Sequence, residues 1–391
     1  MHNKLTQFDL VVIGAGIQGA GVAQAAAAAG YSVLVLEQTA IAAGTSSKSS
    51  KLIHGGLRYL ESGQFALVRE SLRERALLLK LAPDLVRLQP LHIPVYKNST
   101  RSPLLIRAGL SLYAALAGLA PEARFTSLPQ ADWQNLEGLR QDNLQAVFRY
   151  FEAQTDDAAL TRAVLNSAMG LGAELQMPAR FIAAERSATQ CRVDYLHNDR
   201  QMSVTCHVMV NCAGPWAMDV HTHIQPPLPA PAIDLVQGSH LLLPPLVRQH
   251  FYLEAPQDKR AVFVLPWQGQ LLVGTTETLH KGAPELASCL DVEKDYLLQT
   301  LQHYFPDVQV PVESVESFSG LRVLPRSEHS AFRRSREVLM TVDNKMQPRI
   351  LSLMGGKLTT YRATAEQALA RIKISLPPRV TRADTKKLPL S

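Results

Sequence analysis

The feature that most constrains this chain lies near its start, where an apolar run leads into closely spaced glycines. Residues 8–13 are apolar, the turn Gly14-Ala-Gly-Ile-Gln-Gly19 follows, and an alanine-rich stretch then ends at Gly30. A second apolar run, residues 31–36, ends at Glu37. This order of strand, glycine turn, helix and strand predicts a βαβ unit, and with it a parallel sheet covered by helices.

The three glycines of this turn have separate uses in a dinucleotide site. Gly14 allows the tight turn, Gly16 lets the backbone approach a pyrophosphate, and Gly19 lets the helix pack against the strand. The helix N-terminus offers N–H groups and a partial positive charge to phosphates. Glu37 follows Gly19 by 18 residues, where a carboxylate can accept both ribose hydroxyls and disfavours a 2′-phosphate. The pattern therefore predicts FAD or NAD rather than NADP.

A loop rich in hydroxyl residues and glycines follows, covering residues 44–60. One interpretation is a flexible serine-rich linker. However, Lys51, His54 and Arg58 stand among apolar residues there, and hydroxyl and N–H groups can line a pyrophosphate and a ring edge. We therefore favour a cofactor loop. The residues expected at the cofactor are Thr45, Ser46, Ser47, Lys51, Leu52, His54, Gly55 and Gly56.

A second strand–glycine–helix order lies near the other end of the chain. Residues 350–354 are apolar, two glycines follow, and residues 361–373 have a helical pattern. A helix N-terminus there can face the pyrimidine end of an isoalloxazine, which is anionic when reduced, and Lys357 would favour that charge. An ordinary β–α turn explains this segment equally well. Under the cofactor interpretation the contacts are Gly355, Gly356, Lys357, Leu358 and Thr359.

Other segments complete a coarse prediction of the elements. Helices are expected over residues 65–81 and 158–170, the second capped by Asp156-Asp157, and residues 204–211 and 240–276 have strand patterns. We expect Pro83, Pro90 and Pro94 to break the chain, and residues 376–391 to form a loose tail.

Composition excludes several classes of protein. The chain has 391 residues, long enough for two domains, and its 6% aromatics, scattered basic residues and net charge of +6 do not favour a nucleic-acid partner. Its four cysteines show no zinc spacing, so we expect no metal and, by default, the reducing cytoplasm. We expect neither a leader nor a membrane span, because the most apolar segment, residues 104–120, is interrupted by Arg107.

Several motifs together resemble those of the flavin-dependent glycerol-3-phosphate dehydrogenase family. In chain order they are the run from Thr45 to Glu61, Asp156-Asp157, Cys212-Ala-Gly-Pro-Trp216, Gly238-Ser-His240, Gly274-Thr-Thr-Glu277, Gly320-Leu-Arg322 and Gly355-Gly-Lys-Leu-Thr-Thr-Tyr-Arg362. The resemblance covers about residues 8–375. It implies an α/β fold, with a Rossmann-like FAD-binding domain of the glutathione-reductase and D-amino-acid-oxidase type and an antiparallel-sheet substrate domain.

The implied domains are discontinuous in sequence. Residues 1–90, 150–222 and 320–375 are expected to bind FAD, and residues 91–149 and 223–319 to bind substrate. Two features depart from the family pattern. We expect the chain to lack the family's usual C-terminal helical domain, and Val323 stands after Arg322 where the family usually has proline. The first departure leaves open an oligomer or a partner chain that replaces the domain.

The resemblance implies oxidation of sn-glycerol 3-phosphate to dihydroxyacetone phosphate. Hydride would pass from C2 to flavin N5, and electrons to a quinone or another acceptor. The positions that it assigns to the phosphate and the flavin-side charge are Arg322, Arg336 and Lys357, with Arg58 near the reacting centre and Gly214 at the cofactor. His240 is the favoured general base, because imidazole titrates near neutral pH, and His54 is its rival.

Other functions remain open at this stage. One is an FAD-dependent oxidoreductase of an amino acid or a 2-hydroxy acid, and another is a flavin-binding subunit without turnover. For residues 104–120 a core helix is favoured over a helix in a membrane interface. The resemblance to the family supports the membrane-interface interpretation, because it implies quinone reduction at the cytoplasmic face of the inner membrane.

Overall fold

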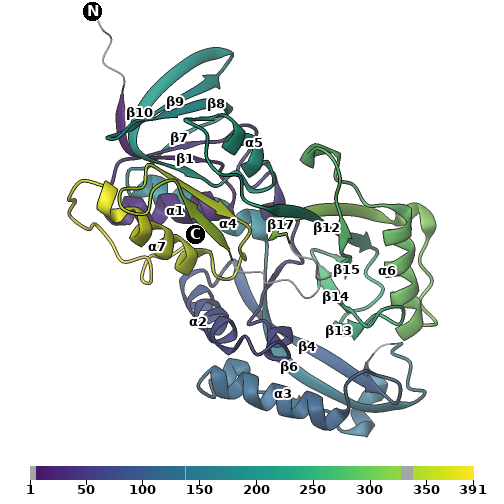
Figure 1. The fold of residues 1–391 in the computed structure, drawn as a ribbon. Coiled ribbons are helices and arrows are strands. Elements are labelled where there is room, and N and C mark those ends of the chain that lie inside the picture. Colours follow the sequence, from purple (N-terminus) through teal and green to yellow (C-terminus); the bar gives the residue numbers. More distant parts are fainter. Residues whose placement is uncertain (1–5, 137, 327–337) are drawn as a thin grey trace, which may run out of the picture.

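The computed structural model describes residues 6–136, 138–326 and 338–391, which form two β-sheets with helices packed against them (Figure 1). The first sheet has nine strands and the second has ten among these residues. The C-terminal end of the chain lies on the side of the first sheet, beside α7 in the left half of Figure 1. The two sheets place segments that are distant in sequence around a shared cavity.

The first sheet contains the predicted βαβ unit. Strand β1 (Gln7–Ile13), helix α1 (Ile17–Ala28) and strand β2 (Val33–Leu36) follow one another, and β1 pairs in parallel with β2. The other parallel strands are β7 (Glu174–Gln176), β10 (Arg200–Asn211) and β19 (Ile350–Met354). Beyond β10 the sheet continues through β9 (Cys191–His197), β8 (Ala179–Arg186) and β11 (Ile224–Gln225), and β18 (Leu339–Val342) pairs with β19.

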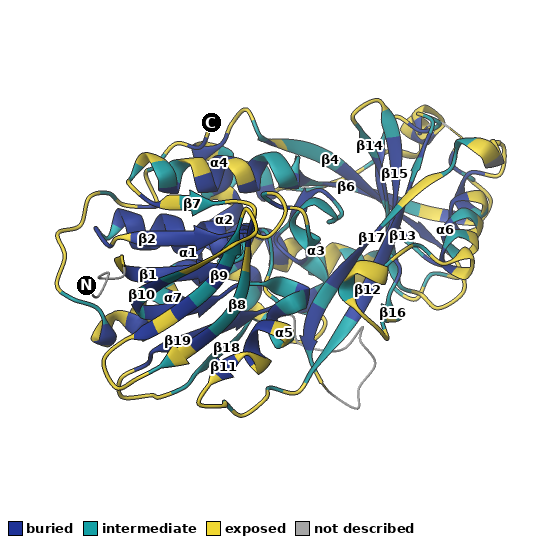
Figure 2. Cartoon of the chain, turned by 90° about the horizontal axis from the view of Figure 1, so that it is seen from above, coloured by how far each residue is buried: buried dark blue, intermediate teal, exposed yellow. Residues whose placement is uncertain are grey.

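Helix α1 is almost wholly buried between the sheet and two other helices (Figure 2). Its neighbours are α4 (Asp157–Gly170) and α7 (Tyr361–Ile372), and the short helix α5 (Ala217–Thr222) follows β10. Small residues make this close packing possible: a Cβ added to Gly21 would lie 2.8 Å from the ring of Tyr361. Asp156 caps α4 by accepting the Ala159 N–H, as predicted.

The second sheet is mostly antiparallel, and its strands come from distant parts of the chain. Its strands are β3 (Leu52–Ile53), β4 (Val86–Tyr96), β5 (Thr126–Ser127), β6 (Leu144–Thr155), β12 (Ile233–Leu243), β13 (His250–Glu254), β14 (Ala261–Trp267), β15 (Gln270–Gly274), β16 (Thr278–Leu279) and β17 (Glu316–Pro325). Helices α2 (Phe65–Leu81), α3 (Pro103–Leu116) and α6 (Asp291–Tyr304) pack against it. Three of the predicted domain boundaries, those at residues 90, 150 and 320, fall within β4, β6 and β17.

Two local predictions are wrong. Pro90 and Pro94 do not break the chain but lie inside β4, which pairs with β6 along its whole length. On its other side β4 pairs with β13 only at Leu91 and His92, so the prolines sit where no second strand needs their missing N–H groups.

The segment after residue 375 is not loose. The N–H groups of Arg382 and Ala383 both donate to the Ala28 carbonyl in the last turn of α1. Arg379 forms an ion pair with Asp9, and Leu390 is buried. The last carbonyl groups of a helix have no partner within the helix, and this segment supplies N–H donors to one of them. The segment is thereby fixed against α1.

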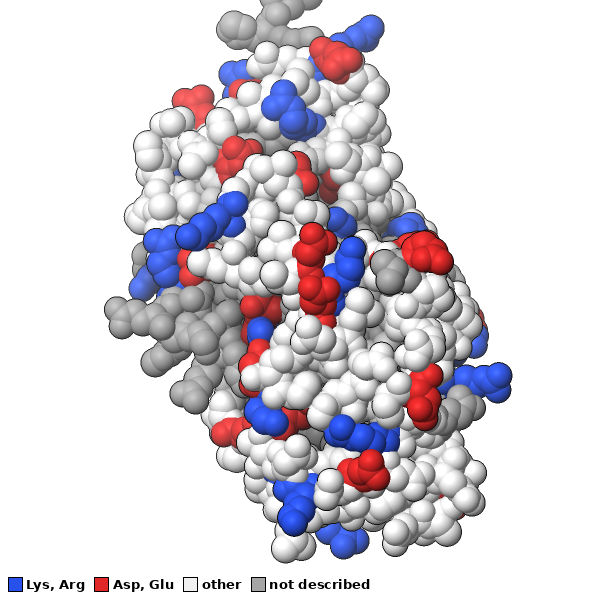
Figure 3. Space-filling model, turned by 90° about the vertical axis from the view of Figure 1, so that its right-hand side faces the viewer, with Lys and Arg blue, Asp and Glu red and all other residues white. Residues whose placement is uncertain are grey.

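No helix in the described part of the chain is long and apolar enough to cross a membrane. The four cysteines are free thiols. On the face in Figure 3, the acidic and basic side chains of the described residues are interspersed.

Candidate active site

A cavity of about 690 Å³ lies where the two sheets meet, and both contribute to its walls. Glu37 at the end of β2 lines it, as do His240 on β12 and Arg322 on β17. The carboxyl ends of parallel strands are the usual binding edge of such sheets. The cavity therefore joins the predicted dinucleotide site to the predicted substrate residues.

The glycine turn after β1 forms one wall of the cavity. Gly14 has φ +98°, and a Cβ there would lie 2.8 Å from the Cys212 carbonyl oxygen, so only glycine fits. Gly16 also lines the cavity. Gly19 does not, because it packs behind the turn, where an added Cβ would meet the Gly14 carbonyl. Its predicted role in helix–strand packing matches this position, although it is not itself a cofactor contact.

Glu37 is buried at this wall and orders the turn. One carboxylate oxygen accepts the Ala15 N–H at 2.8 Å, and the other accepts the Thr39 N–H at 2.9 Å. Both oxygens keep lone pairs, because each carboxylate oxygen can accept more than one hydrogen bond. Glu37 is thus placed to accept ribose hydroxyls as well.

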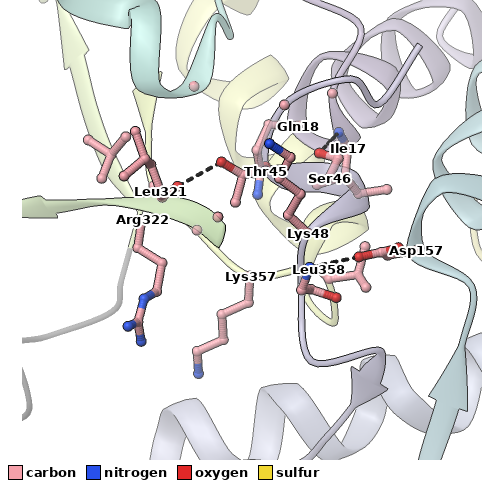
Figure 4. A pocket seen from close by; sticks show the side chains of 18 of the residues that line it. Ile17, Gln18, Thr45, Ser46, Lys48, Asp157, Leu321, Arg322, Lys357 and Leu358 are labelled. Carbon is pink, nitrogen blue, oxygen red and sulfur yellow. Dashed lines mark hydrogen bonds between the residues drawn. The ribbon is translucent and has the colours of Figure 1, made fainter. Parts of the chain in front are cut away.

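The hydroxyl-rich loop ties the two sheets together across the cavity. Ser46 Oγ accepts the N–H of Ile17, the first residue of α1, at 2.8 Å. Thr45 Oγ1 donates to the Leu321 carbonyl on β17 at 2.7 Å, and both bonds are drawn in Figure 4. The predicted loop residues that line the cavity are Thr45, Ser46, Leu52, His54 and Gly56. The hydroxyl-rich loop therefore forms a wall of the cavity and is not a flexible linker.

Three predicted loop contacts lie elsewhere. Lys51 Nζ donates to Asp157 Oδ1 and to the Ser47 carbonyl, both at 2.7 Å, and neither Lys51 nor Ser47 lines the cavity. A buried ammonium group needs such partners, so Lys51 fastens the loop to the start of α4. Gly55 is also outside the lining, and a Cβ there would lie 2.2 Å from Tyr113 Oη.

The second glycine turn forms a neighbouring part of the wall, and a Cβ on Gly356 would lie 2.5 Å from Gln18 Nε2 in the first turn of α1. Gly355 and Gly356 both have positive φ angles, and a Cβ on Gly355 would lie 2.6 Å from the Val323 carbonyl oxygen. Lys357 Nζ lies 3.9 Å from the centre of the Tyr59 ring. Figure 4 shows Lys357 and Arg322 pointing into the same open space. Leu358, Thr359 and Gly214 complete the predicted cofactor residues in the lining.

These walls fit an extended dinucleotide. The turns at Gly14 and Gly355 bring backbone to the cavity surface at points where any side chain would collide with a carbonyl. The first turn of α1 faces the same space through Ile17 and Gln18. Backbone N–H groups and a helix N-terminus suit a pyrophosphate, and Glu37 suits a ribose.

His240 is held with its ring in a tight slot of the second sheet. The ring stacks on Phe318 at 4.9 Å between centroids, and its Nε2 lies 2.8 Å from Ser50 Oγ. A Cβ on Gly274 of β15 would lie 2.1 Å from His240 Cδ2, so glycine is required there. Among the described residues Nδ1 has no hydrogen-bond partner. The slot therefore fixes the ring, whose Nδ1 is buried.

The charge state of His240 follows from its surroundings. Burial, together with the positive charges of Arg322 and Lys51, lowers the pKa of His240 to about 3. The ring is therefore neutral near neutral pH and can accept a proton. An anion bound beside Arg322 would offset part of that positive charge and raise the proton affinity of the ring.

Arg322 reaches the cavity from β17. Its Nη2 donates to the Thr276 carbonyl at 3.1 Å, and its Nη1 lies 3.1 Å from Glu277 Oε1. A Cβ on Gly238 would lie 3.1 Å from Nη2, so the Gly238-Ser-His240 motif makes room for the guanidinium as well as carrying the imidazole.

The cavity is lined by Arg58, His240, Arg322 and Lys357, the residues for which the sequence predicts catalytic or substrate-binding roles. Arg336 lies outside the described residues, so its predicted role stays a prediction. Sequence reasoning missed several residues of the lining, among them Gln18, Lys48, Ser50, Tyr59, Tyr150, Glu152, Asp157 and Tyr252. Ser50 and Tyr59 lie within the loop already singled out, but nothing in the sequence around Tyr252 marks it.

The described residues hold no group of three or more His, Cys, Asp or Glu side chains that could bind a metal ion.

The sequence family described as FAD dependent oxidoreductase matches residues 9–362 of the chain. A glycerol-3-phosphate dehydrogenase of Pseudomonas aeruginosa is 36% identical over 377 residues, covering 94% of this chain and 72% of the relative. A D-erythritol 1-phosphate dehydrogenase of Brucella abortus is 35% identical over 378 residues, covering 94% of this chain and 74% of the relative.

Among solved structures, the glycerol-3-phosphate dehydrogenase of Bacillus halodurans complexed with FAD superposes with a TM-score of 0.75 at 25% identity. The match covers 100% of this chain and 68% of that one. The expected fold class is therefore confirmed. The chain belongs to the FAD-dependent oxidoreductases and, within them, to the flavin-dependent glycerol-3-phosphate dehydrogenase family, with FAD as its cofactor.

Proposed function

We propose that this protein oxidises sn-glycerol 3-phosphate to dihydroxyacetone phosphate. The observation that carries the proposal is the placement of His240, Arg322, Arg58 and Lys357 in one cavity with the dinucleotide cradle. FAD, when bound, supplies the acceptor for the hydride that leaves the substrate carbon. The protein's own residues then have to hold the cofactor, anchor a phosphate and take a proton.

The cofactor is held by both glycine turns and by the loop between them. The turn at Gly14 and Gly16 and the start of α1 bind the pyrophosphate, and Glu37 binds the adenosine ribose. The turn at Gly355 and Gly356 and the loop around His54 contact the ring end. Each of these residues lines the cavity.

Arg322 anchors the substrate phosphate, with Arg58 and Lys357 adding positive charge. A guanidinium can make paired, charge-assisted hydrogen bonds to phosphate oxygens. In the cavity Arg322 is already fixed by the Thr276 carbonyl and by Glu277, so it is oriented before an anion arrives. Such preorganisation lowers the entropic cost of binding.

His240 accepts the proton of the substrate hydroxyl. Its ring is neutral at neutral pH, and the contact with Ser50 fixes its orientation. The phosphate beside Arg322 raises the proton affinity of the ring when substrate is present. The base therefore becomes stronger when it is needed.

A second phosphorylated polyol is a specific alternative. The relative named D-erythritol 1-phosphate dehydrogenase is 35% identical, almost the same as the relative named glycerol-3-phosphate dehydrogenase at 36%. Both names contain a phosphate on a terminal carbon of a polyol. The cationic cavity suits either, and the length of the polyol chain distinguishes them.

The test is loss of the visible flavin absorbance when substrate is added to the anaerobic holoenzyme. We expect sn-glycerol 3-phosphate to bleach the flavin rapidly, and glycerol, lactate and D-alanine to leave it oxidised. Faster bleaching by D-erythritol 1-phosphate would show that this compound, rather than sn-glycerol 3-phosphate, is the substrate. Bleaching by D-alanine or lactate alone would favour an amino-acid or hydroxy-acid enzyme, and no bleaching by any of them would favour a non-catalytic flavoprotein.

We further propose that a quinone in a membrane reoxidises the protein, with helix α3 as the surface that meets the bilayer. Leu110, Tyr113 and Ala114 of α3 are buried, whereas Leu104 and Leu105 are 78% and 57% exposed. The prediction of a core helix is therefore wrong for this face. Exposed leucines on an amphipathic helix suit an interface between lipid and water.

A further inference from the structure

A buried carboxylate lies behind the substrate wall, on the face of β12 that is turned away from the cavity. Glu293 is in the first turn of α6 and is only 3% exposed. It does not line the cavity. Its carboxylate accepts hydrogen bonds from Gln237 Nε2, Ser239 Oγ, Thr276 Oγ1 and Thr278 Oγ1 at 2.7, 2.7, 2.7 and 2.8 Å, and from the Leu290 N–H at 3.1 Å.

This arrangement requires an ionised carboxylate. Burial opposes ionisation, but the hydrogen bonds from Ser239, Thr276, Thr278 and the Leu290 N–H outweigh it and hold the pKa of Glu293 below its ordinary value. A carboxylate has only acceptor sites, and five donors converge on it here. An amide in its place would turn its own N–H groups toward some of those donors.

The same hydrogen bonds lead directly to the substrate residues. Thr276 Oγ1 donates to Glu293 and accepts the Ser239 N–H at 2.9 Å. The carbonyl of Thr276 accepts the Arg322 guanidinium at 3.1 Å. Ser239 precedes His240 in β12, and alternation along the strand turns Ser239 toward Glu293 and His240 toward the cavity.

We propose that Glu293 is a positioning residue, which acts through Thr276 on Arg322 and through Ser239 on His240. It fixes the Thr276 carbonyl that orients the guanidinium, and it fixes the strand that carries the imidazole. The role rests on the proposed function, because Arg322 and His240 are the groups taken to hold the phosphate and the proton. A neutral cluster of hydroxyl groups could fill the same space but could not bind all five donors at once.

The test compares Glu293→Gln with the unaltered holoenzyme at equal FAD content. We expect KM for sn-glycerol 3-phosphate to rise about tenfold, the size expected for a lost hydrogen bond to a charged group. Inorganic phosphate should also become a weaker competitor by a similar factor. That second readout needs no turnover and reports on the anion site at Arg322.

Two further comparisons separate positioning from stability. Asp9→Asn removes another buried carboxylate that is hydrogen-bonded to Ser32 and Arg379, at the opposite end of β1 from the cavity. It should lower the unfolding temperature but leave KM and phosphate inhibition unchanged. Thr276→Val removes the hydroxyl that donates to Glu293 and should raise KM. Thr276→Ser keeps that hydroxyl, and its KM should match that of the unaltered protein.

Each outcome bears on one proposal. If Glu293→Gln does not fold, the pair of Thr276 variants decides in its place. Unchanged KM and unchanged phosphate inhibition in Glu293→Gln and Thr276→Val would overturn the positioning role. An unaltered holoenzyme that sn-glycerol 3-phosphate fails to bleach would instead overturn the proposed function.

Discussion

Glu37 lines the cavity while each of its carboxylate oxygens already accepts a backbone N–H group. The sequence predicted the first property from the position of an acid at the end of the second strand. The second property depends on the tertiary structure, because Ala15 precedes α1 and Thr39 follows β2. At the scale of the residue, one side chain therefore orders the glycine turn and offers acceptors to a ribose.

Glu37→Ala should lower both FAD content and stability. The buried Ala15 N–H and the partly buried Thr39 N–H would lose their acceptor, and we expect the free energy of unfolding to fall by about 1–3 kcal/mol. The ratio of flavin to protein absorbance and an unfolding curve measure the two effects. Glu185→Ala, at an exposed carboxylate, is the control and should change neither. Full flavin occupancy in Glu37→Ala would remove Glu37 from the site.

Ser50→Ala should slow flavin reduction without reducing FAD content. The variant removes the group that lies 2.8 Å from His240 Nε2, so the tautomer of the ring is no longer fixed by that contact. We expect the rate of bleaching by substrate to fall about tenfold, as for loss of one hydrogen bond. Stopped-flow absorbance measures it, and Ser50→Thr, which keeps the hydroxyl, should recover most of the rate. An unchanged rate in Ser50→Ala would show that Ser50 does not act on His240.

At the scale of the element, the loop between β2 and α2 contains two lysines with different fates. Lys48 lines the cavity, whereas Lys51 is buried against Asp157 at the start of α4. Lys51 has φ +60°, a backbone conformation that residues other than glycine rarely adopt. Both lysines follow serines, so local sequence could not tell the cavity residue from the buried ion pair.

Lys51→Met should destabilise the protein strongly. It leaves Asp157 buried without its cation, and breaking a buried pair in this way costs about 3–5 kcal/mol. Denaturant unfolding measures the loss. The double variant Lys51→Met, Asp157→Asn removes both charges and should recover part of it, and Lys48→Met should shift stability by no more than about 0.5 kcal/mol. Equal stability of Lys51→Met and the unaltered protein would contradict the structural role.

Elements with strong local patterns were predicted well, and those decided by their neighbours were not. The helix at residues 65–81 and the strand at residues 350–354 have the predicted bounds. Strand β4 escaped prediction because its prolines are tolerated only where one side of the strand is unpaired. Which side is unpaired depends on strands that lie elsewhere in the chain.

At the scale of the whole molecule, three histidines are buried in the second sheet. Burial lowers the pKa of His92, lowers that of His250 to about 4, and with nearby cations lowers that of His240 to about 3. The unfolded chain binds protons at these sites below their ordinary pKa of 6.5 while the folded protein does not. Stability therefore falls as the pH drops below that value.

Between pH 7 and about pH 5, His240 and His250 should each remove up to about 2 kcal/mol from the free energy of unfolding, and His92 should act in the same direction. Denaturant unfolding at both pH values measures the loss. His250→Gln should have a flatter pH dependence than the unaltered protein. Equal pH dependence in the two proteins would show that folding does not lower the pKa of His250.

Membrane attachment through α3 is also a property of the whole surface. The unaltered protein should pellet with anionic vesicles, and Leu104→Ser, Leu105→Ser should release it while activity toward a soluble dye stays normal. Arg101 is paired with Glu61 and Glu254, so the apolar contribution should dominate and high salt should weaken binding only partly. Leu286→Ser, at a leucine 71% exposed on another element, is the control. Failure of the unaltered protein to pellet would contradict a membrane quinone as acceptor.

The sequence by itself determined the βαβ unit, the two glycine turns and the identity of the family, because these depend on short-range patterns and ordered motifs. Tertiary structure alone decided that Ser50 meets His240, that Gly274 leaves space for its ring, and that Glu293 stands behind Arg322. It also decided that Lys51 is structural and that residues 376–391 are held against α1. The physical reason is that burial and hydrogen bonding of a side chain depend on partners brought from distant segments, and these partners are not encoded in the residues beside it.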